Sequence, residues 1–300
     1  MVSPSMYATQ SPVTDPGDMA WWLAGLPADL DGLRRVARDL VIHYRADDPV
    51  GHGIPAERLA EIDTRYAGAM LHRLHELAAQ PLTTARQPAQ RLVGCCRDFT
   101  ILFLTLARYQ GIPARARVGF ATYFVPGFNV DHEIAEVWDA TERRWRLVDA
   151  ELSDDHVDPT NGAALDGLDI PRDRFLTGGT AWLACRDGQA DPARFVVDPG
   201  LDIPSTRSWP QLRNNLIHDL AVLNKVEPLL WDAWGFIERD DLSAAEEQLL
   251  DDVAVATAAG DAGVAHARVL YSAHAELRMP PVVVSYDPLG GPSRQVRHAI

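Results

Sequence analysis

The sequence predicts an α+β fold, in which a cysteine-bearing helix packs on an antiparallel sheet and further helices precede and follow this core. Two observations predict it. Residues 93–119 carry a cysteine pair, an apolar run with helical spacing, and then a glycine and a proline that end a helix. Between residues 114 and 149 the apolar pattern changes from a period of about 3.6 to a period of about two.

The composition limits the class of protein. Of the 300 residues, 47% are hydrophobic and 23% are charged, as in an ordinary soluble globular chain. The formal net charge of -14 argues against binding to nucleic acid or to anionic membranes. Three cysteines, two of them adjacent, do not make a disulfide framework of the secreted type, so we expect a cytoplasmic protein.

Two helices are expected before the cysteine pair. Asp29 can cap the first, whose apolar positions share one face until about residue 44. The second is amphipathic and is expected over residues 55–78. It carries His72 and His75, but no carboxylate or cysteine stands at a supporting distance, so this pair is typical of a solvated face and not of a metal site.

The helix that begins at Cys96 is a scaffold for a nucleophile. Its first turn has unpaired backbone N–H groups and the positive end of the helix dipole, which favour a thiolate over a thiol. Gly111 is the expected stop residue. A cysteine beside an apolar run is equally compatible with an inert packing residue, so the downstream residues decide between the two readings.

Three strands are expected downstream, at residues 114–124, 131–138 and 145–149, and their short connections make them antiparallel. His132 lies near the start of the second strand and Asp149 ends the third. Adjacent strands would bring these two side chains together. The aspartate could then accept one imidazole N–H and leave the other ring nitrogen to face a thiol, as thiol acyl transfer requires.

The rest of the chain predicts mainly helices. Residues 150–208 form a long covering segment with one short helix around Cys185, and a longer helix follows over residues 208–225. Residues 243–278 predict two helices broken at Gly260, and the final stretch is extended.

Four short motifs carry a family resemblance. G-C-C-R-D-F, G-I-P-A-R, D-H-E-I-A-E-V-W and W-R-L-V-D occur in this order and resemble the core of the transglutaminase-like superfamily, whose fold is a papain-like cysteine-enzyme core. The resemblance covers residues 88–150. A narrower likeness to a group of bacterial transglutaminase-like proteins extends to about residue 236.

The resemblance implies a role for each residue of a triad. Cys96 would be the nucleophile, His132 the base and Asp149 the orienting acid. The family places its nucleophile two residues after a glycine and two before an acid, which selects Cys96 over Cys95. Cys95 and Cys185 are then packing residues.

Two residues depart from the family pattern: Ile134 stands where an aromatic residue is common, and Ala150 stands where a proline often follows the aspartate. The acidic calcium loops of the animal enzymes are not recognisable, so we expect metal independence and no cofactor. The domains expected are a disordered tail over 1–17, a transglutaminase-like catalytic domain with N-terminal helices over 18–240, and a C-terminal helical extension over 241–300.

Several residues are secondary candidates. Asp98 lies in the first helical turn, where a cap is favoured over a substrate role. The oxyanion would be bound by the Cys96 backbone N–H and by a second donor, for which Gln87, Gln90 and Tyr44 are the candidates.

Asn214, Asn224 and Trp231 belong to the narrower likeness. They could form walls of the cleft, but packing or helix capping is the simpler role for each. Arg115 and Arg117 suit either carboxylate recognition or an ion pair with Glu136. From these secondary candidates, we predict Gln90, Arg115, Arg117 and Trp231 as substrate-binding residues.

These observations predict a cysteine-dependent acyl-transfer enzyme that works through a thioester acyl-enzyme. Its substrate would be a small-molecule or carrier-protein-bound acyl or amide compound, and amide formation, hydrolysis and acyl cyclisation stay open, as does a place in natural-product biosynthesis. No nucleic-acid or membrane partner is expected, and the oligomeric state is open. The alternative is a non-catalytic transglutaminase-like module that uses the cleft for binding or scaffolding.

Overall fold

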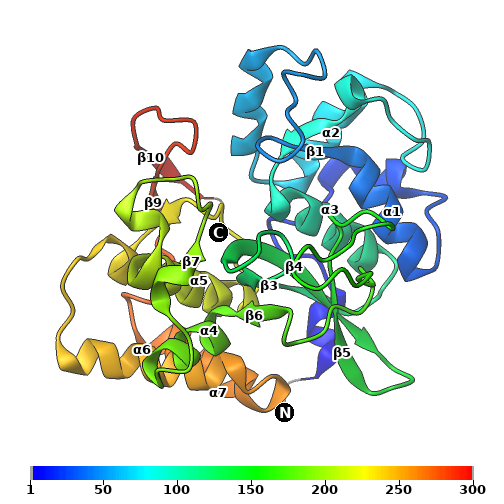
Figure 1. The fold of residues 1–300 in the computed structure, drawn as a ribbon. Coiled ribbons are helices and arrows are strands. Elements are labelled where there is room, and N and C mark those ends of the chain that lie inside the picture. Colours follow the sequence, from blue (N-terminus) through cyan, green and yellow to red (C-terminus); the bar gives the residue numbers. More distant parts are fainter. Residues whose placement is uncertain (1–2, 299–300) are drawn as a thin grey trace.

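A five-stranded sheet lies at the centre of the fold, with helices on both sides of it (Figure 1). The computed structural model describes residues 3–298. Strands β5, β4, β3 and β6 lie side by side and antiparallel, and β7 pairs in parallel with the start of β4. The predicted α+β class is confirmed. The strands are β3 (Ala114–Ala121), β4 (Asn129–Asp139), β5 (Arg144–Val148), β6 (Phe175–Thr177) and β7 (Phe195–Val196).

The helices form two groups that use different cores. The first group packs on one face of the sheet in a core shared with alternate residues of β3 and β4. The second group lies against the opposite face and is centred on the longest of its helices. The first group is α1 (Leu30–Leu40), α2 (Ala67–Leu77) and α3 (Cys96–Tyr109); the second is α4 (Gly178–Arg186), α5 (Ser208–Leu223), α6 (Ala244–Ala258) and α7 (Asp261–Ala273).

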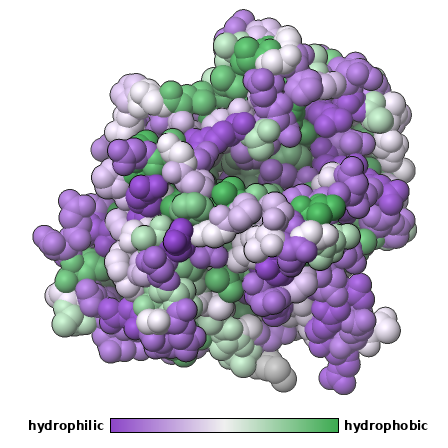
Figure 2. Space-filling model, in the orientation of Figure 1, coloured by the Kyte–Doolittle hydropathy of each residue, from purple (hydrophilic) through white to green (hydrophobic). Residues whose placement is uncertain are grey.

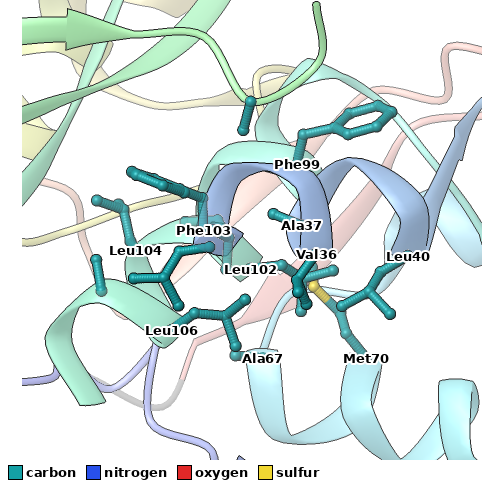
Figure 3. Close-up of a cluster of buried hydrophobic side chains, with 14 of the residues drawn as sticks. Val36, Ala37, Leu40, Ala67, Met70, Phe99, Leu102, Phe103, Leu104 and Leu106 are labelled. Atoms are coloured by element: carbon teal, nitrogen blue, oxygen red, sulfur yellow. The ribbon is translucent and has the colours of Figure 1, made fainter. Parts of the chain in front are cut away.

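Helix α3 forms where the sequence predicts it, because its apolar residues fill the first core. Phe99, Leu102, Phe103 and Leu106 are spaced by three and four residues and are at most 3% exposed. They gather with side chains of α1 and α2 (Figure 3). Gly111 follows the helix with φ of 75°, a conformation that glycine adopts without steric cost.

The first predicted helix is shorter than expected. Asp29 caps α1 through a hydrogen bond that its carboxylate accepts from the Gly32 N–H at 2.8 Å. The helix ends at Leu40, and β1 (Val41–His43) pairs in parallel with β2 (Leu92–Gly94). The prediction of helix to residue 44 is wrong because β-branched residues suit this pairing, which leads the chain to the start of α3.

The continuous helix predicted over residues 55–78 is also wrong. The 3-10 helix η3 (Ala56–Asp63) comes first, and α2 begins only at Ala67. Arg65 lies in the interruption, where it is 8% exposed and donates to the Asp232 carboxylate and to Ser285 Oγ. A buried ion pair with a distant segment therefore overrides the local helical pattern.

The N-terminal segment is ordered, which makes the predicted disordered tail over 1–17 wrong for its described part; residues 1–2 lie outside the described residues. Tyr7 in η1 (Pro4–Ala8) is 1% exposed, and its hydroxyl donates to the Leu223 carbonyl at 2.7 Å. Its ring lies beneath the Arg115 guanidinium at 5.1 Å. Burial against distant segments therefore orders the N-terminal segment, although its composition is typical of a disordered tail. The boundaries predicted at residues 240 and 241 stay predictions.

The C-terminal stretch is extended, as expected, and forms a small antiparallel sheet. In it β9 (Val282–Ser285) lies between β8 (Asp232–Ala233) and β10 (Arg294–Arg297). The remaining short elements are 3-10 helices: η2 (Gly17–Leu23), η4 (Pro88–Gln90), η5 (Pro192–Arg194), η6 (Pro204–Thr206) and η7 (Gly235–Glu238).

Candidate active site

The start of α3 is held by a capping box and a buried arginine. The Cys95 N–H donates to Asp98 Oδ2 at 2.8 Å, and the Cys95 side chain accepts from the Asp98 N–H, so the capping role expected of Asp98 is confirmed. Arg97 is fully buried and donates to the carbonyls of Pro228, at 2.6 Å, and Glu227, at 2.8 Å. Cys96, the first helical residue, is therefore fixed in position and is 7% exposed.

A hydrogen bond one turn along α3 ties the helix to the strand that carries His132. Thr100, four residues after Cys96 and on the same side of the helix, donates its hydroxyl to the Glu133 carbonyl at 2.8 Å. The turn that carries Cys96 therefore lies beside the start of β4.

His132 and Asp149 are brought together as predicted. The Nε2 atom of His132 lies 2.8 Å from Asp149 Oδ2, and the same oxygen accepts a hydrogen bond from the Tyr123 hydroxyl at 2.7 Å. The other oxygen of Asp149 accepts from the Glu151 N–H at 2.9 Å. Three donors thus hold the carboxylate, which fixes Nε2 as the protonated nitrogen of the neutral ring and leaves Nδ1 as the open one.

The pKa values of this pair shift in opposite directions. Burial alone would raise the pKa of Asp149, but the His132 charge and the hydrogen bonds hold it below its usual value. Burial acts to lower the pKa of His132, but the neighbouring carboxyls, first of all Asp149, raise it above the ordinary value. His132 is therefore a stronger base than a free imidazole.

The state of the Cys96 thiol differs from the expectation. A hydrogen bond with Cys95, burial, and the charges of Glu151 and Asp131 raise the pKa of Cys96 well above its ordinary value. The helix N-terminus was expected to favour a thiolate. Here the hydrogen bond with Cys95, burial and the acidic neighbours outweigh the dipole, so Cys96 rests as a neutral thiol.

Two further carboxyls lie close to His132 and Asp149. Asp131 accepts a hydrogen bond from Asn215 Nδ2 at 2.7 Å, and burial raises its pKa to about 6. Glu151 Oε2 lies 4.0 Å from His132 Nδ1, and burial raises the Glu151 pKa to about 8. The site thus holds more acid than the predicted triad contains.

The opposite wall of the site comes from β1 and the loop that follows it. Tyr44 stacks on His43 with ring centroids 5.2 Å apart, and its charge interactions include both Cys95 and Cys96. Tyr44 and Trp231 pack against the same buried cluster, which contains Ile42 and Val93. The space-filling view shows a recess with an apolar floor between the part of the molecule that carries β1 and α2 and the part that carries β3 and β4 (Figure 2).

The predicted substrate-binding arginines are not open to a substrate. Arg115 and Arg117 are each 1% exposed, and both pair with Glu136 on the neighbouring strand. Arg117 also donates to both carboxylate oxygens of Asp219 on α5, each at 2.8 Å. Of the two roles predicted for these arginines, carboxylate recognition and an ion pair with Glu136, the ion pair is present.

The other secondary candidates mostly serve local structure. Gln90 Oε1 accepts from the Gln87 N–H at 3.1 Å, so these two side chains form the cap of η4. Asn224 donates to the Leu220 carbonyl at the end of α5, and Asn214 donates to the Leu230 carbonyl. Trp231 packs against the same buried cluster as Tyr44, and its indole N–H donates to Asp63 Oδ1 at 3.3 Å, so its role in substrate binding stays a prediction.

Sequence reasoning missed four residues of the site. Tyr123 lies just past the end of β3, Asp131 precedes His132, Glu151 follows Asp149 by two residues, and Asn215 lies in the middle of α5. Only the neighbouring positions of Asp131 and Glu151 gave a signal, because an acid beside a candidate catalytic residue is a candidate for a role of its own. Nothing local marks Tyr123 or Asn215.

Three other kinds of feature can be judged from the described residues: a pocket, a metal site and a membrane-spanning helix. A pocket of about 440 Å³ is lined by Trp21, Trp22 and His75 among others, but by none of the residues around Cys96. Residues 3–298 hold no group of three or more His, Cys, Asp or Glu side chains placed for a metal ion, and His72 pairs with Asp18 on the surface. No helix in this range is long and apolar enough to cross a membrane.

Comparison with known proteins identifies one part of the chain. Residues 76–150, a quarter of its length, match the family model of the transglutaminase-like superfamily. No curated protein matches the chain. A solved structure from Cytophaga hutchinsonii, provisionally named a cysteine protease, is 19% identical over 59% of this chain and 51% of that chain, with a TM-score of 0.21. The chain therefore spans about half the length of that protein. The matched family segment contains Cys96, His132 and Asp149.

Proposed function

We propose that this chain, whose residues 76–150 match the family model of the transglutaminase-like superfamily, is a cysteine-dependent acyl-transfer enzyme with Cys96, His132 and Asp149 as its triad. The observation that carries the proposal is the 2.8 Å contact between His132 Nε2 and Asp149 Oδ2, made beside the start of α3. It fixes one imidazole nitrogen and leaves the other free to take a proton.

The reaction begins from the neutral thiol. Cys96 Sγ attacks the acyl carbonyl while His132 Nδ1 takes the thiol proton, which gives a tetrahedral oxyanion and an imidazolium. The intermediate collapses to a Cys96 thioester, and His132 returns the proton to the leaving group. The acceptor then attacks the thioester, His132 takes the acceptor proton, and the proton returns to Sγ as the thiol is released.

Asp149 and Tyr123 support this proton transfer from the rear of the ring. The carboxylate stabilises the imidazolium that forms, and the Tyr123 hydroxyl keeps the carboxylate oriented through a hydrogen bond of 2.7 Å. The raised pKa of His132 strengthens the base that a neutral thiol needs. The acyl group enters the apolar recess of Figure 2, on either a small molecule or a carrier protein.

The experiment that tests the proposal follows acylation of Cys96 in the full chain. Short-chain and phenylacetyl thioesters of N-acetylcysteamine are mixed with the protein, quenched with acid, and read by intact mass with fragmentation. We expect an acyl group on Cys96, none in Cys96→Ala, and a rate at least about 100-fold lower in His132→Ala. The matched control is Cys185→Ala, which removes another buried thiol and leaves the rate unchanged.

An acylation rate that is unchanged in His132→Ala would contradict the proposal, as would an adduct confined to Cys95 or Cys185. Absence of any adduct across the thioesters would favour the alternative, a non-catalytic binding module.

Tyr44 is the proposed second donor to the oxyanion, beside the Cys96 backbone N–H. Burial raises the pKa of Tyr44, so its hydroxyl is a neutral donor, and its charge interactions include Cys95 and Cys96. Gln87 and Gln90 are engaged in the η4 cap. We expect Tyr44→Phe to slow thioester formation roughly 100-fold with little change in the free energy of unfolding. Tyr286→Phe is the matched control, because the Tyr286 hydroxyl donates to Glu238 on the surface; equal rates in the two variants would remove Tyr44 from the oxyanion site.

A further inference from the structure

Glu151 occupies the open side of His132 without a structural reason to be there. Its Oε2 atom lies 4.0 Å from His132 Nδ1, the nitrogen that has to exchange a proton with Cys96. The side chain is only 17% exposed, and Oε2 is buried with no hydrogen-bond partner among residues 3–298. Placing a buried carboxyl oxygen without a partner costs stability, so a role in the reaction is the natural explanation.

The groups whose charges interact with Glu151 come from several segments. They are His132 on β4, Cys96 on α3, Asp149 two residues before it, Asp47 in the loop after β1, and Tyr123 after β3. Among these groups, only His132 can carry a positive charge. An ionised Glu151 is therefore attracted to the imidazolium and repelled by the remaining acids.

We propose that Glu151 is a positioning residue that acts through His132: its carboxylate stabilises the imidazolium that forms when Nδ1 takes the Cys96 proton. This inference rests on the proposed function. It gives the imidazolium two carboxylates, Asp149 at Nε2 and Glu151 at Nδ1. The 4.0 Å separation is within the range in which opposite charges shift each other's ionisation strongly.

The direction of the pH effect follows from the state of Glu151. Burial raises its pKa to about 8, so at pH 6 the group is a neutral acid and does not help His132. As the pH rises through 8, the carboxylate forms, the imidazolium is stabilised, and acylation becomes faster. Ionised Glu151 also disfavours a thiolate at Cys96, but the contact within ion-pair distance is the one with His132.

The test measures the rate of Cys96 acylation by the same thioesters from pH 6 to pH 9. Wild type and Glu151→Gln should react equally at pH 6, and wild type should be about tenfold faster at pH 9. Glu151→Asp, which keeps a shorter carboxylate, should recover part of the difference. Glu142→Gln is the matched control, because Glu142 is exposed on the β4–β5 turn and pairs with Arg144; it should follow wild type at every pH.

Several outcomes would overturn the inference. A ratio of wild-type to Glu151→Gln rates that is constant with pH marks a structural role only, and a faster Glu151→Gln at pH 9 means that repulsion of the thiolate dominates. If Glu151→Gln does not fold, a wild-type rate that is flat between pH 7 and 9 still overturns it. Acylation that depends on His132 but not on Glu151 leaves the proposed function intact, whereas a Cys96 that takes no acyl group at any pH overturns both.

Discussion

Replacing Asp149 with asparagine is expected to slow acylation of Cys96 roughly 10,000-fold while the protein stays folded. Asp149 Oδ2 accepts from His132 and Tyr123, and Oδ1 accepts from the Glu151 N–H, so an asparagine sets its NH2 group against a donor in either orientation. With the NH2 group at the Oδ2 position, the imidazole turns its proton toward Cys96 and loses its function as a base; in the other orientation, the clash with the Glu151 N–H displaces the amide that holds the ring. The measurement is the single-turnover rate with a thioester at pH 7.5, together with the midpoint of urea unfolding.

Asp169→Asn is the matched control for this variant. Asp169 is partly exposed and pairs with the exposed Arg144, so its replacement should leave the rate within twofold of wild type. An Asp149→Asn enzyme that keeps more than a tenth of the wild-type rate would show that the contact of His132 with Asp149 is not what orients the base.

The second large effect is on stability. Arg117→Ala is expected to lower the free energy of unfolding by about 3–5 kcal/mol, because it leaves the buried Asp219 carboxylate without its charged partner. Arg117 donates to both oxygens of Asp219, each at 2.8 Å, and to Glu136 at 3.2 Å. All three side chains are at most 1% exposed. Urea unfolding followed by circular dichroism gives the value.

Arg172→Ala is the control for the effect of burial. Arg172 pairs with the same Glu136, at 2.8 Å, but its side chain is 55% exposed, so its loss should cost about 1 kcal/mol or less. Equal losses in the two variants would mean that Arg117 and Asp219 do not form a tightly coupled buried pair.

The predictions that held were those carried by local chemistry. The Asp29 cap, the apolar face of α3 and the glycine after it each depend on residues within a few positions of one another. The antiparallel order of β3, β4 and β5 follows from short connections. Interactions of this range are present in the sequence itself, so the sequence can predict them.

The predictions that failed were those in which a distant partner overrode the local pattern. Arg65 breaks the helix expected over residues 55–78 because Asp232 lies across from it. Tyr7 orders the N-terminal segment because Leu223 and Arg115 cover it. In each case the partner is more than 100 residues away in the chain, so no local pattern could predict the contact.

Helix caps, periodicity and short turns are local properties, so the order of residues predicts the α+β class, the helix that begins at Cys96 and the meander that carries His132 and Asp149. The electrostatics of the site depend instead on tertiary packing. The hydrogen bond with Cys95, burial, and the charges of Glu151 and Asp131 from separate segments raise the pKa of the Cys96 thiol where the helix dipole alone would lower it. Burial and the charge of neighbours depend on what surrounds a group in space, which the order of residues does not state.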